Sequence, residues 1–326
     1  MKVFVAGATG AIGKQLVPML IESGHEVTGM TRSRARAQAI ESMGARPAVA
    51  DALDPEAVAQ AVAGAEPEVV IHELTSIELS SFSRSLDKMF AQTNRLRTEG
   101  TDHLLAAARA VGARRFIAQS FAGWPFEMTG GLIKSEEDPL QADPPKTIRE
   151  GIAALKHLEA AVPGAEGIDG LVLRYGGFYG PGTSLSLNPD GEQVEMIRKR
   201  RWPVIGDGAG IFSLVHIEDA AAATVAALDH GEPGVYNIVD DEPAPMGVVM
   251  PEVAKVIGAP PPRRFPRWLG RLVAGEGMTL MSTEARGASN AKAKRELGWV
   301  LRYPSWRLGI REGLEQNVAE PVRSAA

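Results

Sequence analysis

GATGAIG, residues Gly7 to Gly13, is the stretch of sequence that decides the fold. It follows a short apolar run, Lys2 to Ala6, which is typical of a buried strand, and it opens a helical pattern from Gly13 to Glu22. Glycines at this spacing let the backbone turn tightly and approach a pyrophosphate, while the start of the helix offers free N–H groups to that anion. The sequence therefore predicts a dinucleotide-binding loop, with cofactor contacts expected from Gly7, Thr9, Gly10, Ala11, Ile12 and Gly13.

Short β-branched runs alternate with longer helical stretches up to about residue 175. This alternation is typical of βαβ units around a parallel sheet. The expected strands are Lys2 to Ala6, Glu26 to Met30, Pro47 to Ala50, Val69 to Glu73, Arg115 to Ser120 and Gly170 to Arg174. The expected helices are Gly13 to Glu22, Pro55 to Val62 with Asp54 as its N-cap, Asp87 to Val111 and Ile148 to Val162. We therefore predict an α/β fold, a Rossmann-like doubly wound parallel sheet, with the dinucleotide-binding domain over residues 1–175.

One segment inside this half has little periodicity. Residues 121–147 are rich in glycine and proline, and a loop of that length inside a compact domain is more often a binding element than a plain connection. We expect it to close over a small-molecule substrate.

Composition excludes several classes of function. A net charge of -5 disfavours nucleic acid as a partner, and the densest basic cluster, Arg198 to Arg201, is short enough to be a solvated helix end. The absence of cysteine excludes disulfides, thiolate metal sites and cysteine nucleophiles. The first apolar run is too short for a signal peptide, and no later run approaches a membrane span, so we expect a cytoplasmic protein.

The end of the second strand predicts which dinucleotide is preferred. In sites that prefer NAD, an acidic residue stands about 20 positions after the glycine loop and binds the ribose hydroxyls. Here the sequence is Met30-Thr31-Arg32-Ser33-Arg34, without an acid. A guanidinium pairs with a 2′-phosphate, so Arg32, helped by Thr31 or Ser33, favours NADP(H) over NAD(H). The alternative is that Arg32 is a solvated residue at a helix start.

The ends of the third and fourth strands complete the expected cofactor site, through Asp51, Ala52 and Leu74. Asp51 is placed either to contact the adenine edge or to cap the turn that it begins. His72 and Glu73 end the fourth strand on the side where the ligand crevice of such sheets lies. Glu73 is a candidate acid or base, with helix capping as the alternative.

Segments along most of the chain carry a family resemblance. They are GATGAIG, DALDP at Asp51 to Pro55, EGTDHLLAAA at Glu99 to Ala108, LRYGGFYGPG at Leu173 to Gly182, GDGAGIFSLVHIEDAA at Gly206 to Ala221, GVYNIVDDEP at Gly234 to Pro243 and AKRELGW at Ala293 to Trp299. With these segments the chain resembles the extended short-chain dehydrogenase/reductase superfamily, also called the NAD-dependent epimerase/dehydratase family. The resemblance implies a smaller, mainly substrate-binding domain over residues 176–326, with residues 212–240 returning to the Rossmann core. It also implies a homodimer through the Asp87 and Ile148 helices.

The family's catalytic pair is Tyr-x-x-x-Lys on one helix, where the lysine lowers the pKa of the phenol. None of the four tyrosines has a lysine four positions later. Lys156 matches the family lysine, but four positions earlier stands Ile152, or Gly151 if the register slips by one. The family's serine or threonine after the fifth strand is also displaced, because Ser120 comes one residue early and Phe121 takes its place.

The remaining catalytic candidates are therefore Lys156, Ser120 and Tyr179. Lys156 is expected to hold the nicotinamide ribose or to protonate a substrate, or else is a solvated helical lysine. Ser120 is expected to contact the nicotinamide. Tyr175 and Tyr179 either replace the lost phenol or pack against the loop over residues 121–147. His216 and Asp219 are typical of a helix cap, and we expect no metal site.

Three functions stay open on this sequence. The first is an NADP(H)-dependent oxidoreductase with a rearranged proton donor, which acts on a small or medium carbonyl, imine or alkene substrate. The second is a nucleotide-sugar epimerase or dehydratase with tightly bound NAD. The third is a non-catalytic protein that senses NADP(H).

Overall fold

Seven strands form one parallel sheet at the centre of the molecule. The computed structural model describes residues 1–77, 86–187 and 191–314. In spatial order the strands are β12 (Gly234–Ile238), β7 (Asp169–Tyr175), β5 (Arg115–Phe121), β4 (Val69–His72), β1 (Lys2–Ala6), β2 (Glu26–Thr31) and β3 (Arg46–Val49). The order reverses between β1 and β4, which is where ligands bind in such sheets. The predicted doubly wound α/β fold is confirmed.

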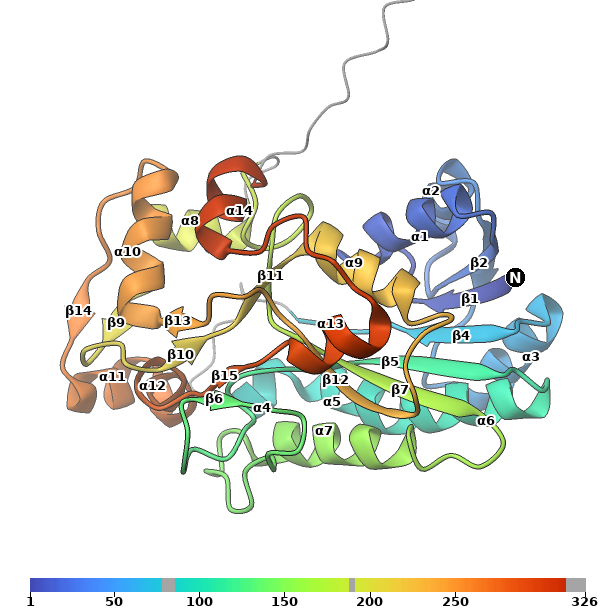
Figure 1. Ribbon diagram of the computed structural model, residues 1–326, viewed down its shortest axis with the longest axis horizontal. Helices are drawn as coiled ribbons and strands as arrows, with labels where there is room; N and C mark the ends of the chain where they lie inside the picture. Colours follow the sequence, from blue (N-terminus) through green and yellow to red (C-terminus); the bar gives the residue numbers. More distant parts are fainter. Residues whose placement is uncertain (78–85, 188–190, 315–326) are drawn as a thin grey trace, which may run out of the picture.

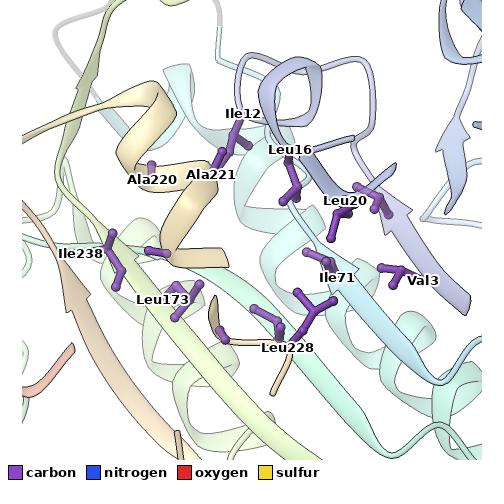
Figure 2. Close-up of a cluster of buried hydrophobic side chains, with 14 of the residues drawn as sticks. Val3, Ile12, Leu16, Leu20, Ile71, Leu173, Ala220, Ala221, Leu228 and Ile238 are labelled. Carbon is purple, nitrogen blue, oxygen red and sulfur yellow. The ribbon is translucent and has the colours of Figure 1, made fainter. Parts of the chain in front are cut away.

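Helices cover both faces of the sheet (Figure 1). On one face lie α1 (Gly13–Glu22), α2 (Arg34–Ser42) and α9 (Ile217–Ala226); on the other lie α3 (Pro55–Ala65), α6 (Thr101–Ala110) and α7 (Arg149–Ala161). Figure 2 shows the first face, where Leu16 and Leu20 of α1 lie over Ile71 of the sheet and Ala221 of α9 lies beside Ile12. Because both faces are covered, the central strands β1 and β4 are apolar and buried along nearly their whole length.

Local chemistry sets the helix ends that the sequence predicted. Asp54 Oδ1 accepts a hydrogen bond from the N–H of Ala57 at 3.0 Å, and Pro55 is the first residue of α3. The same helix runs to Ala65, beyond the expected Val62, because the chain leaves it only where Glu66 adopts a left-handed φ of 45°.

The long helix expected from Asp87 to Val111 is interrupted. It consists of α4 (Leu86–Met89), α5 (Ala91–Arg95), a π-helical segment η2 (Leu96–Gly100) and α6. At the junction with η2 the Thr98 hydroxyl donates to the carbonyl of Asn94 at 3.1 Å. A π segment adds a residue to the turn and shifts which side chains face the sheet, and such segments occur frequently at functional sites.

The C-terminal elements gather beyond the carboxyl ends of the strands, on the left of Figure 1. They are α8 (Glu192–Arg198), β9 (Val204–Ile205), β10 (Ile211–Phe212), β13 (Ala244–Pro245), α10 (Met246–Val256), β14 (Arg264–Phe265), α11 (Arg267–Val273), α12 (Gly275–Thr283) and α14 (Trp306–Glu312). The pair β8 (Gly177–Tyr179) and β11 (Leu214–His216) links them to the sheet, and α13 (Ala291–Leu297) contacts β12. β12 itself lies in the sheet, whereas the domain boundary at residue 175 stays a prediction.

The loop over residues 121–147 is tied down along its length. It contains β6 (Ile133–Lys134), which pairs with β15 (Gly287–Ala288). Arg286 donates to the carbonyl of Met128, and the N–H of Asn237 donates to Glu136 at 2.8 Å. The loop is therefore joined to C-terminal segments. Within the described residues, no helix combines the length and apolar composition that crossing a membrane requires.

Candidate active site

The glycine loop, residues 7–13, is built for close approach. Gly7 has a φ of +100°, and a Cβ there would lie 2.7 Å from the carbonyl oxygen of Glu73. A Cβ on Gly13 would clash with the backbone of Gly7 and Ala8. Hydrogen bonds inside the loop leave the N–H groups of Ala11 and Ile12 unpaired among the described residues. These groups precede α1, so the loop fits the pyrophosphate of a dinucleotide.

A cavity of about 510 Å³ extends from this loop to the C-terminal elements. Its wall is mainly apolar, with aromatic side chains from both halves of the chain: Phe90, Phe121, Trp124, Phe178, Trp202 and Phe212. The charged residues that line it are Arg32, Arg36, Glu73, Arg97, Glu192 and Arg201. An apolar hollow with a few polar groups is typical of a small-molecule site.

The predicted 2′-phosphate residues lie together at one end. Thr31, Arg32, Ser33 and Arg36 line a hollow of about 390 Å³, and Arg32 and Arg36 also line the cavity. Neither guanidinium has a hydrogen bond or ion pair to another described residue. Arg36 was missed in the sequence, although it stands four positions after Arg32 at the start of a helix, a spacing that brings side chains together.

Two other expected cofactor contacts lie elsewhere. Asp51 Oδ1 accepts from the N–H of Leu53 at 3.1 Å, so Asp51 caps its turn. Ala52 is buried in the core, and neither residue lines the cavity in the described part of the chain. Leu74 does line it, as does Thr9.

Ser120 points away from the cavity because side chains alternate along a strand. Its neighbours Gln119 and Phe121 line the cavity, whereas the Ser120 hydroxyl donates to Glu159 Oε1 at 2.6 Å. The same carboxylate accepts two hydrogen bonds from Arg174, at 2.8 and 2.6 Å. Ser120 therefore belongs to a buried ion-pair cluster on the α7 face of the sheet.

Helix α7 turns Lys156 outward. Lys156 is exposed, and its Nζ donates to the carbonyl of Gln141 at 2.7 Å. The buried positions four apart are Gly151, whose N–H donates to Asp87 at 2.9 Å, and Leu155. A Cβ on Gly151 would lie 3.6 Å from the ring of Trp124, which lines the cavity. The slipped register is thus the one that faces inward, with glycine and leucine in place of tyrosine and lysine.

Neither tyrosine candidate offers a free phenol to the cavity. Tyr179 is fully buried beside the ring of His216, at 5.2 Å between centroids, and close to Gly309 of α14. The Tyr175 hydroxyl donates to Glu73 Oε1 at 3.1 Å and lies 2.7 Å from Thr224 Oγ1. Burial raises the pKa of Tyr175 well above its ordinary value, so it is a neutral partner of Glu73.

Glu73 directly follows β4, and its backbone carbonyl lies against Gly7 of the glycine loop. It is buried and lines the cavity, and its Oε2 has no hydrogen-bond partner in the described structure. Burial raises the pKa of Glu73 to about 8, while the hydrogen bond from Tyr175 acts in the opposite direction. The Glu73 carboxyl accepts its hydrogen bond from Tyr175, a residue of strand β7, so Glu73 does not cap a helix.

Arg97, on η2, is a cavity residue that the sequence reasoning missed. It is 6% exposed, and no described residue gives it a hydrogen bond or an ion pair. Burial lowers its pKa to about 10, which still leaves it protonated at neutral pH. The available signal was its position seven residues before Leu104, on the apolar stripe of the expected helix.

Of the pair that the sequence suggested as a helix cap, His216 caps α9, whereas Asp219 instead holds the chain at residues 302 and 303. His216 Nδ1 accepts from the N–H of Glu218 at 3.3 Å, and the Asp219 carboxylate accepts from the N–H groups of Arg302 and Tyr303. Among the residues that the structure describes, no group of three histidine or acidic residues could hold a metal ion.

Comparison with known proteins gives consistent matches. The model of the NAD dependent epimerase/dehydratase family matches residues 3–239. A 3-diazoavenalumate denitrifying reductase from a Streptomyces species is 44% identical over 317 residues, which are 95% of this chain and 99% of that protein. A 2-alkyl-3-oxoalkanoate reductase from Stenotrophomonas maltophilia is 29% identical over 270 residues, 80% of this chain and 77% of that protein.

Solved structures resemble the fold over nearly the whole chain. A UDP-glucose 4-epimerase from Thermotoga maritima has a TM-score of 0.76 at 20% identity and covers 96% of this chain and 97% of its own. The Thermus thermophilus UDP-glucose 4-epimerase, in complex with NAD, has a TM-score of 0.73 at 24% identity, covering 96% and 98%. At this identity the likeness concerns the fold alone.

Proposed function

The chain belongs to the NAD-dependent epimerase/dehydratase family, and from that premise we propose that it is an NADP(H)-dependent reductase that replaces the diazo group of a small aromatic carboxylate by hydrogen. Proteins of this kind are NAD(P)-dependent oxidoreductases or epimerases, and this chain is one of them. The proposal concerns which cofactor and which substrate it uses.

The charged hollow at Arg32 supports NADP(H). The glycine loop would hold the pyrophosphate, and Arg32 and Arg36, with the hydroxyls of Thr31 and Ser33, would hold a 2′-phosphate. Two unpaired guanidiniums suit a phosphate better than they suit the two hydroxyls of an NAD ribose.

The inward face of α7 lacks the Tyr-x-x-x-Lys pair, and this is the observation from which we infer the type of reaction. Gly151 and Leu155 cannot donate a proton, and Lys156 faces outward. A reduced nicotinamide supplies a hydride. A carbonyl that accepts hydride also needs a proton on its oxygen, whereas a diazonium carbon does not: the C–H bond forms, the C–N bond breaks, and dinitrogen leaves with the electron pair of that bond. The site therefore suits an acceptor whose leaving group needs no proton.

The relative from Streptomyces supports this chemistry, because its name describes the denitrifying reduction of a diazo carboxylate. The cavity supports an aromatic ring, since Phe121, Trp124 and Phe178 line it.

The test uses purified protein, NADPH and the diazonium salt of an aminohydroxybenzoate, with a nitrogen-15 label in the diazo group. We expect labelled dinitrogen and one NADPH oxidised per dinitrogen released, and deuterium on the ring carbon when the nicotinamide carries deuteride. NADPH oxidation with ketones, but none with the diazonium salt, would overturn the proposal.

A second candidate is ketone reduction, and Glu73 is the observation that favours it. Glu73 lines the cavity and is held neutral by burial up to a pKa of about 8, so it is a proton source beside the glycine loop. The relative from Stenotrophomonas is named as an oxoalkanoate reductase. Glu73→Gln separates the two candidates, because it should reduce the kcat of ketone reduction about 100-fold and leave diazonium reduction within about twofold.

A further inference from the structure

Arg97 carries a buried charge that the protein does not neutralise. Arg97 lies on η2, which is joined to the end of β4 by the hydrogen bond between Leu96 and His72, and its side chain is 6% exposed and lines the cavity. No described residue accepts a hydrogen bond from it. Removing a charge from water without a partner costs several kcal/mol, so buried guanidiniums are almost always paired.

The groups around Arg97 leave a net positive charge. Glu159 is the acid that attracts it electrostatically, but both oxygens of Glu159 are already bonded to Arg174, and one of them also to Ser120. His72 is neutral, because burial lowers its pKa to about 4, and its Nε2–H donates to the carbonyl of Leu96 at 3.1 Å. Glu159 therefore neutralises Arg174 behind the cavity, and the Arg97 guanidinium at the cavity wall keeps its charge without a partner among the described residues.

We propose that Arg97 binds the carboxylate of the substrate in the cavity and thereby selects anionic aromatic substrates. This inference rests on the proposed function for the presence of a small-molecule substrate in that cavity. A bound carboxylate would complete the charge balance of the Arg97, Arg174 and Glu159 cluster, and a planar guanidinium fits it through two parallel hydrogen bonds.

The anions of the cofactor have other partners. The pyrophosphate has the glycine loop and the start of α1, and the 2′-phosphate has Arg32 and Arg36, at the end of β2. These positions lie across β1 from η2, which packs with α6 and α7 on the opposite face of the sheet. No third anionic group remains on the dinucleotide, so the partner of Arg97 is the substrate.

The direct test measures binding without turnover. Isothermal titration of the complex with NADP⁺ would use 4-hydroxybenzoate and, in parallel, its neutral methyl ester. In the wild type the acid should bind about 10- to 100-fold more tightly than the ester, the value of a hydrogen-bonded charge pair. In Arg97→Met this preference should disappear, and Arg97→Lys should keep part of it. Equal affinity of acid and ester in the wild type would overturn the proposal.

Arg95→Met is the matched control. Arg95 stands two residues earlier on the same helical stretch, is exposed and pairs with Glu99, so the variant loses the same formal charge outside the cavity. It should keep the preference for the acid. If Arg97→Met weakens the binding of NADP⁺ but not the preference for the acid, Arg97 serves the cofactor and the proposal is wrong.

Thermal unfolding of the ligand-free protein is the second readout. Since an unpaired buried charge destabilises the fold, Arg97→Met should unfold at a higher temperature than the wild type, at the cost of acid binding. A lower unfolding temperature would assign Arg97 a structural role. Neither measurement needs a diazo compound or hydride transfer. The role of Arg97 in carboxylate binding and the proposed diazo reduction can therefore be refuted independently of each other.

Discussion

At the scale of single residues, the buried carboxyl of Glu73 should make the stability of the fold depend on pH. Its pKa is raised to about 8 by burial, from 4.5, so the folded protein holds a proton that the unfolded chain has released. Stability is therefore lost as the pH rises from about 4.5 to about 8, by ~1 kcal/mol per pH unit, and is constant above that range.

Glu73→Gln should remove this loss and keep the hydrogen bond from Tyr175, since the amide oxygen also accepts. In urea unfolding at pH 5, 6, 7 and 8, a series chosen to span the window set by linkage, the stability gained by the variant should grow with pH. Glu41→Gln, an exposed carboxylate on α2, serves as the control and should show no such trend. A gain that is the same at every pH would contradict the buried, neutral state of Glu73.

Alanine substitutions at Gly7 and Gly24 distinguish the cost of a strained backbone from the cost of a clash with neighbouring backbone. Both have positive φ, +100° and +83°, but only a Cβ at Gly7 meets neighbouring backbone, at 2.7 Å from the carbonyl of Glu73. Gly24→Ala should cost about 1 kcal/mol and leave NADPH binding intact. Gly7→Ala should cost more and weaken NADPH binding at least about tenfold, because the loop must move from β4. Equal effects in the two variants, measured by urea unfolding and by NADPH fluorescence titration, would refute the role given to the close contact.

At the scale of secondary structure, the rotation of α7 decides which of its side chains pack beneath Trp124, a residue of the cavity wall. The buried face of α7 carries Gly151 and Leu155, and Lys156 lies one step around the helix, bonded to the carbonyl of Gln141. The homodimer expected through this helix and the Asp87 helix stays a prediction.

Lys156→Ala should therefore leave the rate of hydride transfer within about twofold of the wild type, since an exposed side chain is removed without touching the cavity. Single-turnover oxidation of NADPH measures this rate separately from binding. A loss of about 100-fold or more would return Lys156 to the catalytic role that the family pattern suggested.

At the scale of the whole molecule, ligand binding should appear as stability. A ligand that binds only the folded state at 100 times its dissociation constant adds about 2.7 kcal/mol. We expect NADP⁺ to raise the unfolding midpoint of the wild type more than NAD⁺ does at equal concentration. In the double variant Arg32→Ala with Arg36→Ala this difference should vanish, whereas Arg34→Ala, outside the hollow, should keep it. Equal stabilisation of the wild type by both nucleotides would exclude the 2′-phosphate site.

The sequence by itself determined the sheet, the glycine loop and the start of α3. The glycine loop and the start of α3 depend on residues close along the chain, namely a strand that enters a glycine turn and a proline after an N-cap, and the sheet is indicated by the alternation of short apolar runs with helical stretches. The same local reasoning identified Arg32. It did not identify Arg36, because the orientation of α2 against the hollow is a tertiary property.

Only the tertiary structure decided the catalytic face. Strand alternation turns Ser120 toward Glu159, the register of α7 turns Lys156 outward, and the π turn η2 brings Arg97 to the cavity. In each case a shift of one residue along the strand or helix would turn a different side chain toward the cavity. Packing against the sheet fixes that register, whereas the spacing of residues in the sequence does not. A buried charge without a partner is likewise visible only when every neighbour is in place, because its partner is defined by distance in space and not along the chain.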